Sequence, residues 1–127
     1  MKKSIFGMAA VLAAGLFAGS ALAEGDVKKG EKVYKRCKAC HKIEDGKNGV
    51  GPHLFGIVGR KAASVDGYKY SNAMAQFGAD GAVWDAATLD TFLTKPKKAI
   101  KGTKMSFAGL KKEKQRADLI AYLETLK

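Results

Sequence analysis

The sequence predicts an all-α, single-domain fold of about three main helices joined by loops. Residues 27–41 and 113–127 both have the apolar spacing of helices, and a third helical stretch follows Trp84. No segment alternates apolar and polar residues as a half-buried strand would. The region from Gly46 to Gly67 is rich in glycine, so we expect it to be loop. A chain of 127 residues has the length of one domain.

Each predicted helix carries local signals for its start, its end or its buried face. Asp26 and Asp85 precede the first and third helices, where an aspartate is a good N-cap. Pro96 should end the third helix. Gly30 would let another helix approach the first one closely. The apolar faces are expected to consist of Leu89, Phe92 and Leu93 in the third helix, and of Leu119, Tyr122, Leu123 and Leu126 in the last.

The first 23 residues are typical of a cleaved secretory signal peptide. Lys2 and Lys3 form a basic start, an apolar stretch follows from Ile5 to Leu22, and the segment ends in small residues at Ala23. A membrane anchor is the alternative, but small residues dominate the stretch and it is short for a membrane span. We therefore expect residues 1–23 to be removed, and residues 24–127 to form the domain in the periplasm.

The chain is strongly basic, with a formal net charge of +11. Such a charge suits nucleic acid, an anionic membrane or an acidic docking patch on another protein. No nucleic-acid-binding motif accompanies the charge, and export makes such a partner implausible. Acidic partner proteins are therefore the expected targets. We expect the chain to be a monomer that contacts a membrane surface only transiently.

Both cysteines fall within Cys37-Lys38-Ala39-Cys40-His41, which has the C-x-x-C-H spacing of covalent haem attachment. On a helix these thiols and the imidazole would share one face and could reach one object together. The thiols would add to the haem vinyl groups, and His41 could ligate the iron. A thiol redox pair or half of a zinc site fits less well, because no βαβ pattern and no second ligand cluster is present.

An iron that only moves electrons needs a sixth ligand, and Met105 is the best placed candidate. It lies in a loop-like stretch where Gly102 permits close approach of the backbone to a flat cofactor. From spacing alone, Met105 as a buried core residue is an equal alternative.

Over nearly its whole length after residue 23, the chain resembles the class I cytochromes c, the group that contains mitochondrial cytochrome c and bacterial cytochrome c2. The resemblance rests on a series of motifs in chain order: Gly25-Asp26-Val27 with Gly30 and Tyr34, Cys37 to His41, Gly51-Pro52-His53-Leu54, Gly59-Arg60-Lys61, Gly67-Tyr68-Lys69-Tyr70, Trp84, Pro96-Lys97-Lys98, Gly102-Thr103-Lys104-Met105, and Asp118 to Leu123.

This resemblance implies a cytochrome c fold with His41 and Met105 as axial ligands of one haem c. It also implies that the Pro52 carbonyl accepts a hydrogen bond from the histidine ligand, although Gly-Pro marks turns generally. Leu119 should lie against Gly30, and Tyr34 near Tyr122. The residues implied to surround the haem or face its propionates are Arg60, Tyr70, Trp84 and Thr103. Without the resemblance, Trp84 would be assigned to the core and Arg60 to the surface.

The resemblance further implies a basic ring around the exposed haem edge, although single lysines are usually no more than solvated charges. The positions concerned are Lys32, Arg36, Lys97, Lys98, Lys104, Lys111 and Lys112, together with the aromatic Phe107. The expected activity is one-electron shuttling rather than catalysis, from a cytochrome bc complex to a photosynthetic reaction centre or terminal oxidase. A haem enzyme or gas sensor with a labile sixth ligand is the alternative.

Some positions depart from the family pattern. Lys101 stands where many relatives have proline, so the methionine loop is expected to be less rigid. Met74 replaces a polar residue and puts a buried water network in doubt. The segment between Tyr34 and Cys37 is one residue shorter than in the mitochondrial protein, which we expect to cause a local adjustment. His53 is expected to face solvent.

A chain so short and rich in glycine would need the porphyrin as much of its apolar core. We therefore predict that the haem-free domain is largely disordered, because it cannot bury enough apolar surface by itself. Far-ultraviolet circular dichroism of the haem-free chain should show a helical signal well below that of the loaded protein. Equal helical signals in the two samples would contradict this prediction.

Overall fold

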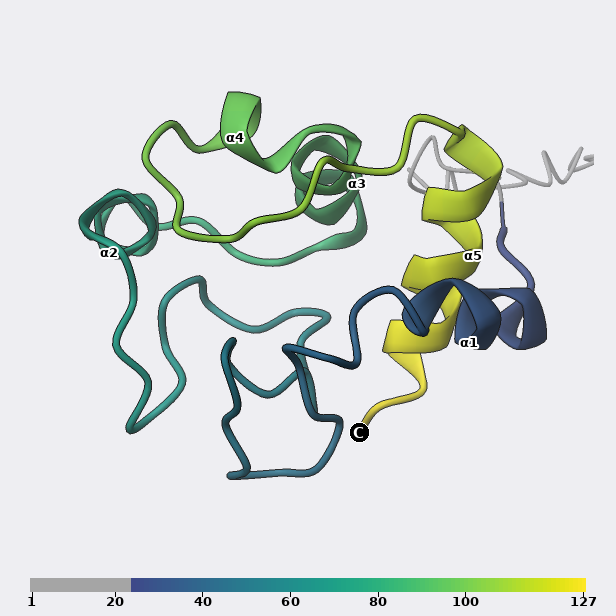
Figure 1. The fold of residues 1–127 in the computed structure, drawn as a ribbon, viewed down its shortest axis with the longest axis horizontal. Helices are drawn as coiled ribbons and strands as arrows, with labels where there is room; N and C mark the ends of the chain where they lie inside the picture. Colours follow the sequence, from purple (N-terminus) through teal and green to yellow (C-terminus); the bar gives the residue numbers. More distant parts are fainter. Residues whose placement is uncertain (1–23) are drawn as a thin grey trace, which may run out of the picture.

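The computed structural model describes residues 24–127, and five helices connected by long loops make up this part of the chain (Figure 1). The helices are α1 (Val27–Tyr34), α2 (Asn72–Ala79), α3 (Ala86–Thr94), α4 (Pro96–Ala99) and α5 (Glu113–Glu124). Within residues 24–127 there is no strand, only an isolated bridge between Lys61 and Val83. The predicted all-α class is confirmed. The signal peptide predicted over residues 1–23 lies outside the described residues.

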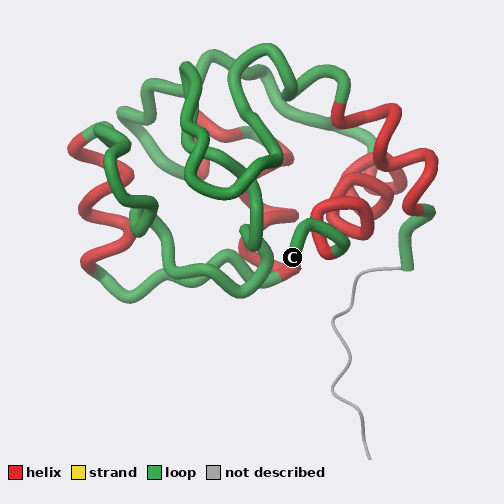
Figure 2. Tube along the Cα trace, turned by 90° about the horizontal axis from the view of Figure 1, so that it is seen from below, coloured by secondary structure: helices red, strands yellow, loops and turns green. Residues whose placement is uncertain are grey.

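The helices surround the middle of the molecule. In Figure 1, α1 and α5 cross on one side, α3 and α4 lie along the top, and α2 lies on the side away from the crossing. Figure 2 shows the loops that connect the helices around the middle of the molecule. Residues 41–71 contain no helix, and they include the predicted Gly46–Gly67 loop. No helix in the described part of the chain is long and apolar enough to span a bilayer.

The crossing of α1 and α5 depends on a glycine. A Cβ atom at Gly30 would lie 1.9 Å from the Asp118 carbonyl oxygen and 2.8 Å from Tyr122 Cβ, so no larger residue fits without moving a helix. These nearest atoms belong to Asp118 and Tyr122 of α5, and the contact implied between Gly30 and Leu119 stays a prediction. The predicted neighbourhood of Tyr34 and Tyr122 is confirmed, with ring centroids 5.4 Å apart.

Asp118 fastens the start of α1 to α5. Its buried carboxylate accepts hydrogen bonds from the backbone N–H of Asp26, at 2.7 Å, and from the Lys114 ammonium, at 2.6 Å. Burial alone would raise the pKa of Asp118, but these two donors outweigh it and hold the pKa below its ordinary value. The charged carboxylate thus links the two ends of the domain through its Oδ1 atom.

The predicted caps are confirmed, whereas some helix ends differ. Asp26 and Asp85 accept hydrogen bonds from the backbone N–H groups of Lys29 and Thr88. The first helix ends at Tyr34 rather than near His41, because the next three N–H groups, those of residues 35–37, bond three residues back instead of four. The last helix ends at Glu124, short of residue 127. The short helices α2 and α4 were not predicted from the sequence.

The Asp118 link gives the stability of the domain a dependence on pH. A carboxylate with a depressed folded-state pKa stabilises the fold above its unfolded pKa of about 4, and this stabilisation is lost as the pH falls through the folded pKa. At pH 7 we expect Asp118→Asn to lower the free energy of unfolding by about 2 kcal/mol. Denaturant titrations of the loaded protein should show this difference shrinking below about pH 4. A difference that is constant with pH would contradict the assignment.

Candidate functional site

A cavity of about 420 Å³ occupies the space that the helices and loops enclose. Its wall is mainly apolar and combines distant parts of the chain. The side chains that give it this character include Leu54 and Ile57 from the long loop, Leu89 and Phe92 from α3, and Leu119 and Leu123 from α5. A large apolar hollow at the centre of so small a domain is costly unless a ligand fills it.

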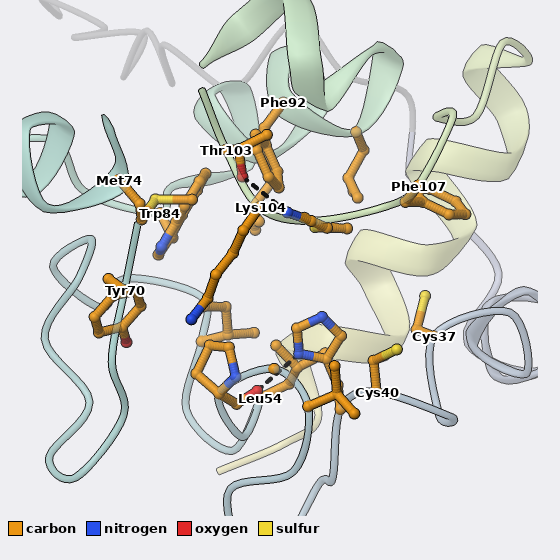
Figure 3. Close-up of a pocket in the computed structure, with 18 of the residues that line it drawn as sticks. Cys37, Cys40, Leu54, Tyr70, Met74, Trp84, Phe92, Thr103, Lys104 and Phe107 are labelled. Carbon is orange, nitrogen blue, oxygen red and sulfur yellow. Dashed lines mark hydrogen bonds between the residues drawn. The ribbon is translucent and has the colours of Figure 1, made fainter. Parts of the chain in front are cut away.

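Cys37, Cys40 and His41 lie together along one part of this wall. Figure 3 shows the two thiols at one end of the cavity, away from Tyr70 and Met74. The three residues sit on turns rather than on an α-helix, but the His41 N–H still bonds the Cys37 carbonyl at 2.9 Å, which preserves their common direction. Burial raises the pKa of the Cys37 thiol to about 11, so this thiol is neutral in its apolar surroundings.

The imidazole of His41 is fixed through one of its nitrogens. Nδ1 lies 2.7 Å from the Pro52 carbonyl oxygen, to which it donates as a protonated nitrogen, and Nε2 is then the nitrogen available to a metal. Burial lowers the pKa of His41, which favours the neutral ring that can act as a ligand. A Cβ at Gly51 would lie 2.5 Å from the imidazole, so only glycine leaves room for the ring here.

Arg60 also lines the cavity, and its guanidinium holds the loop that carries Pro52. It donates to the Phe55 carbonyl at 3.0 Å and to the His53 carbonyl at 2.9 Å. Burial lowers the pKa of Arg60 from its usual high value. The expectation that His53 faces solvent is wrong: the residue is 8% exposed, because the loop anchored by Arg60 turns it inward.

Asn48 connects two loops. Its side-chain oxygen accepts a hydrogen bond from the His53 N–H at 3.1 Å, and its side-chain nitrogen donates to the Asp66 carbonyl at 3.1 Å. The Tyr68 hydroxyl adds a second link by donating to the Val50 carbonyl. The loop around Pro52 is therefore joined to the loop that leads to Tyr70.

Tyr70, Met74 and Trp84 lie at the end of the cavity opposite the thiols (Figure 3). Trp84 is buried, with its ring centroid 5.6 Å from that of Phe77 and 5.0 Å from that of Phe92. The Tyr70 hydroxyl accepts a hydrogen bond from the Val65 N–H, and burial raises the pKa of Tyr70. This end combines apolar surface with hydroxyl and guanidinium groups.

Met105 reaches the cavity from the loop before α5. Its N–H donates to the Thr103 hydroxyl at 3.4 Å, and both residues line the cavity. Gly102 has a φ of 92°, which few residues other than glycine adopt, so the loop turns where the sequence suggested. The Lys104 ammonium donates to the Lys69 carbonyl and lies 4.7 Å from the centroid of the Tyr68 ring. The methionine loop is thereby tied to the loop before α2.

The residues expected to form a basic ring divide into two sets. Arg36, Lys104 and Phe107 line the cavity itself, whereas the other members do not. Those others lie on α1, on α4 and before α5, and all are exposed: Lys32, Lys97, Lys98, Lys111 and Lys112. Sequence reasoning missed Val50, which lines the cavity although it is 75% exposed. The only sequence signal for Val50 as a site residue is its position next to Gly51 and Pro52.

The residues present fit a haem. Two thiols and an imidazole share one part of an apolar cavity, the missing Cβ of Gly51 makes room for that imidazole, and a thioether comes from a separate loop. Thiols that attach to vinyl groups and nitrogen or sulfur donors that ligate iron are the chemistry of c-type haem. The fold and this site define a protein of the c-type haem class.

Comparison with known proteins agrees with this class. The family model described as Cytochrome c matches residues 27–127. A cytochrome c2 from Agrobacterium tumefaciens is 54% identical over 101 residues, which cover 79% of this chain and 91% of the relative. A cytochrome c2 from Rhodomicrobium vannielii is 49% identical over 119 residues, 93% of each chain. The structure of cytochrome cH from Methylobacterium extorquens superimposes with a TM-score of 0.74 at 49% identity, covering 80% of this chain and 99% of the other.

The chain therefore belongs to the cytochrome c family. Its cofactor is one covalently attached haem c, and the two cysteines stand at the attachment position. Like its relatives the chain is an electron carrier and not an enzyme.

Proposed function

We propose that this chain shuttles single electrons in the bacterial periplasm through a haem c whose iron is ligated by His41 and Met105. Its donor would be a cytochrome bc complex, and its acceptor a photosynthetic reaction centre or a terminal oxidase. The observation that carries the proposal is the hydrogen bond between His41 and Pro52 inside a cavity that Met105 also lines.

Each side chain of the site would have a distinct task. Cys37 and Cys40 anchor the haem, and the Pro52 carbonyl orients the His41 ring and makes it a stronger ligand. Met105 closes the sixth position, which leaves no open site for substrate or gas. When bound, the haem supplies a one-electron ferric/ferrous couple. The apolar wall excludes water and so favours the ferrous state with its lower charge.

Four further residues proposed to surround the haem would act on its edges. Arg60 and Tyr70 offer polar groups near one end of the cavity, where buried carboxylates of the propionates need donors. Trp84 adds a rigid wall packed against Phe92. Thr103 holds the Met105 N–H and thus the course of the ligand loop.

The docking surface would be the basic ring. Arg36, Lys104 and Phe107 line the cavity, so a partner bound there would contact the cofactor's edge at close range. The further exposed lysines, at 32, 97, 98, 111 and 112, would draw an acidic partner toward that edge. The contact is expected to be brief, because a shuttle must leave its partner after each electron.

The periplasmic location rests on the signal peptide predicted for residues 1–23. The match to the Rhodomicrobium vannielii cytochrome c2 extends over 119 residues and so reaches into this segment. Cleavage after Ala23 would release residues 24–127 as the working domain.

The visible spectrum tests the proposed ligands. The ferric protein should show the weak red charge-transfer band of a methionine sulfur–iron bond, and Met105→Ala should abolish it and lower the reduction potential by on the order of 0.1 V. Met74→Ala is the matched control, because Met74 also lines the cavity but should leave the band intact.

Two results would overturn the ligand assignment. Persistence of the red band in Met105→Ala would exclude Met105 as the ligand. A high-spin spectrum of the unmodified protein that changes with carbon monoxide at neutral pH would indicate an open iron and favour a gas-binding function.

Electron transfer with the partner should depend steeply on salt. Between about 0.01 M and 1 M salt the Debye length falls from about 30 Å to 3 Å, so steering by the basic ring should disappear. Stopped-flow measurement with a purified cytochrome bc complex should show the second-order rate falling at least about tenfold. Lys97→Glu with Lys98→Glu should slow the low-salt rate, whereas Lys127→Glu, at the chain's end, should have little effect. A rate independent of salt would contradict the proposed docking.

A further inference from the structure

Tyr34 holds both ends of the segment that carries the thiols and the imidazole. It is the last residue of α1, and its backbone carbonyl accepts hydrogen bonds from the N–H of Cys37 at 2.7 Å and of Lys38 at 3.2 Å. Its side-chain hydroxyl donates to the His41 carbonyl at 2.5 Å. One residue therefore contacts the first and the last position of the haem-attachment motif.

The tyrosine is itself rigidly held. It is 7% exposed, and its ring packs against that of Tyr122 across the helix crossing. Burial raises the pKa of Tyr34, so the phenol stays protonated and remains a donor. A hydrogen bond in such a buried, low-dielectric place is stronger than one in water.

His41 is thus held at two points. Tyr34 fixes its backbone carbonyl, and Pro52 fixes ring nitrogen Nδ1 at 2.7 Å. Only the side-chain torsions of His41 lie between these two anchors. Because the residue is held at both ends, it has little freedom to rotate them. Phenylalanine at position 34 could supply the same ring packing but not the first anchor.

We propose that Tyr34 is a positioning residue for His41, and that its hydroxyl sets the orientation of the imidazole plane over the haem. This inference rests on the proposed function, in which His41 is an axial ligand. The connection between Tyr34 and Cys37 is short, and the turn after α1 brings the His41 carbonyl back to the Tyr34 hydroxyl. This geometry makes the hydrogen bond possible. An imidazole fixed in one orientation needs little rearrangement when the iron changes charge.

The test compares Tyr34→Phe with the matched variant Tyr122→Phe, both as haem-loaded proteins. Each removes one hydroxyl from the same buried aromatic pair, but within residues 24–127 only the Tyr34 hydroxyl bonds to His41. In the ferric state, the pattern of haem methyl proton shifts reports the orientation of the imidazole plane. We expect Tyr34→Phe to alter that pattern and to raise the unfolding equilibrium constant about tenfold. Tyr122→Phe should keep the unmodified pattern.

Several outcomes would overturn the inference. An unchanged methyl pattern in Tyr34→Phe would do so, and so would equal changes in both variants, which would indicate a general packing effect. The unmodified ferrous protein provides a measurement that needs no variant. Its proton spectrum should contain a slowly exchanging Tyr34 hydroxyl signal, and rapid exchange of that proton with solvent would exclude the hydrogen bond to the His41 carbonyl.

Failure of the proposed function would have a different signature. If His41 were not a ligand, its ring protons would lack the large haem-induced shifts in the unmodified protein, whatever the Tyr34 result. If His41 is a ligand and only the Tyr34 inference fails, those shifts will be present in Tyr34→Phe, either unchanged or changed no more than in Tyr122→Phe.

Discussion

The close crossing of α1 and α5 at Gly30 is the contact on which the rest of the structure depends. α1 leads directly into the turns that carry Cys37 and His41, and α5 supplies Leu119 and Leu123 to the cavity wall. The distance between the two helices therefore sets the width of the cavity at its attachment end. Asp118 strengthens the same crossing by binding the N–H of Asp26, just before α1. The contact between α1 and α5 therefore determines both how the chain ends pack and where the thiols lie.

Away from this crossing, direct contact between helices is sparse. α5 also packs on α3, and α3 on α4, but the backbone of α2 does not come within 8 Å, Cα to Cα, of three or more residues of any other described helix. It rests instead on the loop at Ala62, where a Cβ on Gly78 would meet the carbonyl oxygen at 2.3 Å. The cavity wall takes residues from the long loop, α3 and α5, so a haem bound there would add an apolar element that all three contact.

Local signals in the sequence predicted the local features of the fold. Asp26 and Asp85 cap helices by bonding N–H groups three residues away, and this spacing is visible in the chain itself. α2 was missed because its small residues give a weak apolar stripe, with only Met74 and Phe77 as large apolar side chains. The burial of His53 was missed because it depends on Arg60, seven residues further on, binding its carbonyl. The attachment motif could be read from spacing, whereas the Tyr34 hydroxyl's partner follows only from how the turn folds back.

Two of the polar links that hold the domain, those made by Asp118 and by Asn48, respond differently to acid. Asp118 is a carboxylate, and protonation removes its charge, whereas the Asn48 amide has no proton to gain or lose in the physiological range. The link that Asn48 makes between the loop around Pro52 and the loop that leads to Tyr70 is therefore insensitive to pH. Acid would therefore weaken the contact between α1 and α5 before it weakens the link that Asn48 makes between its two loops.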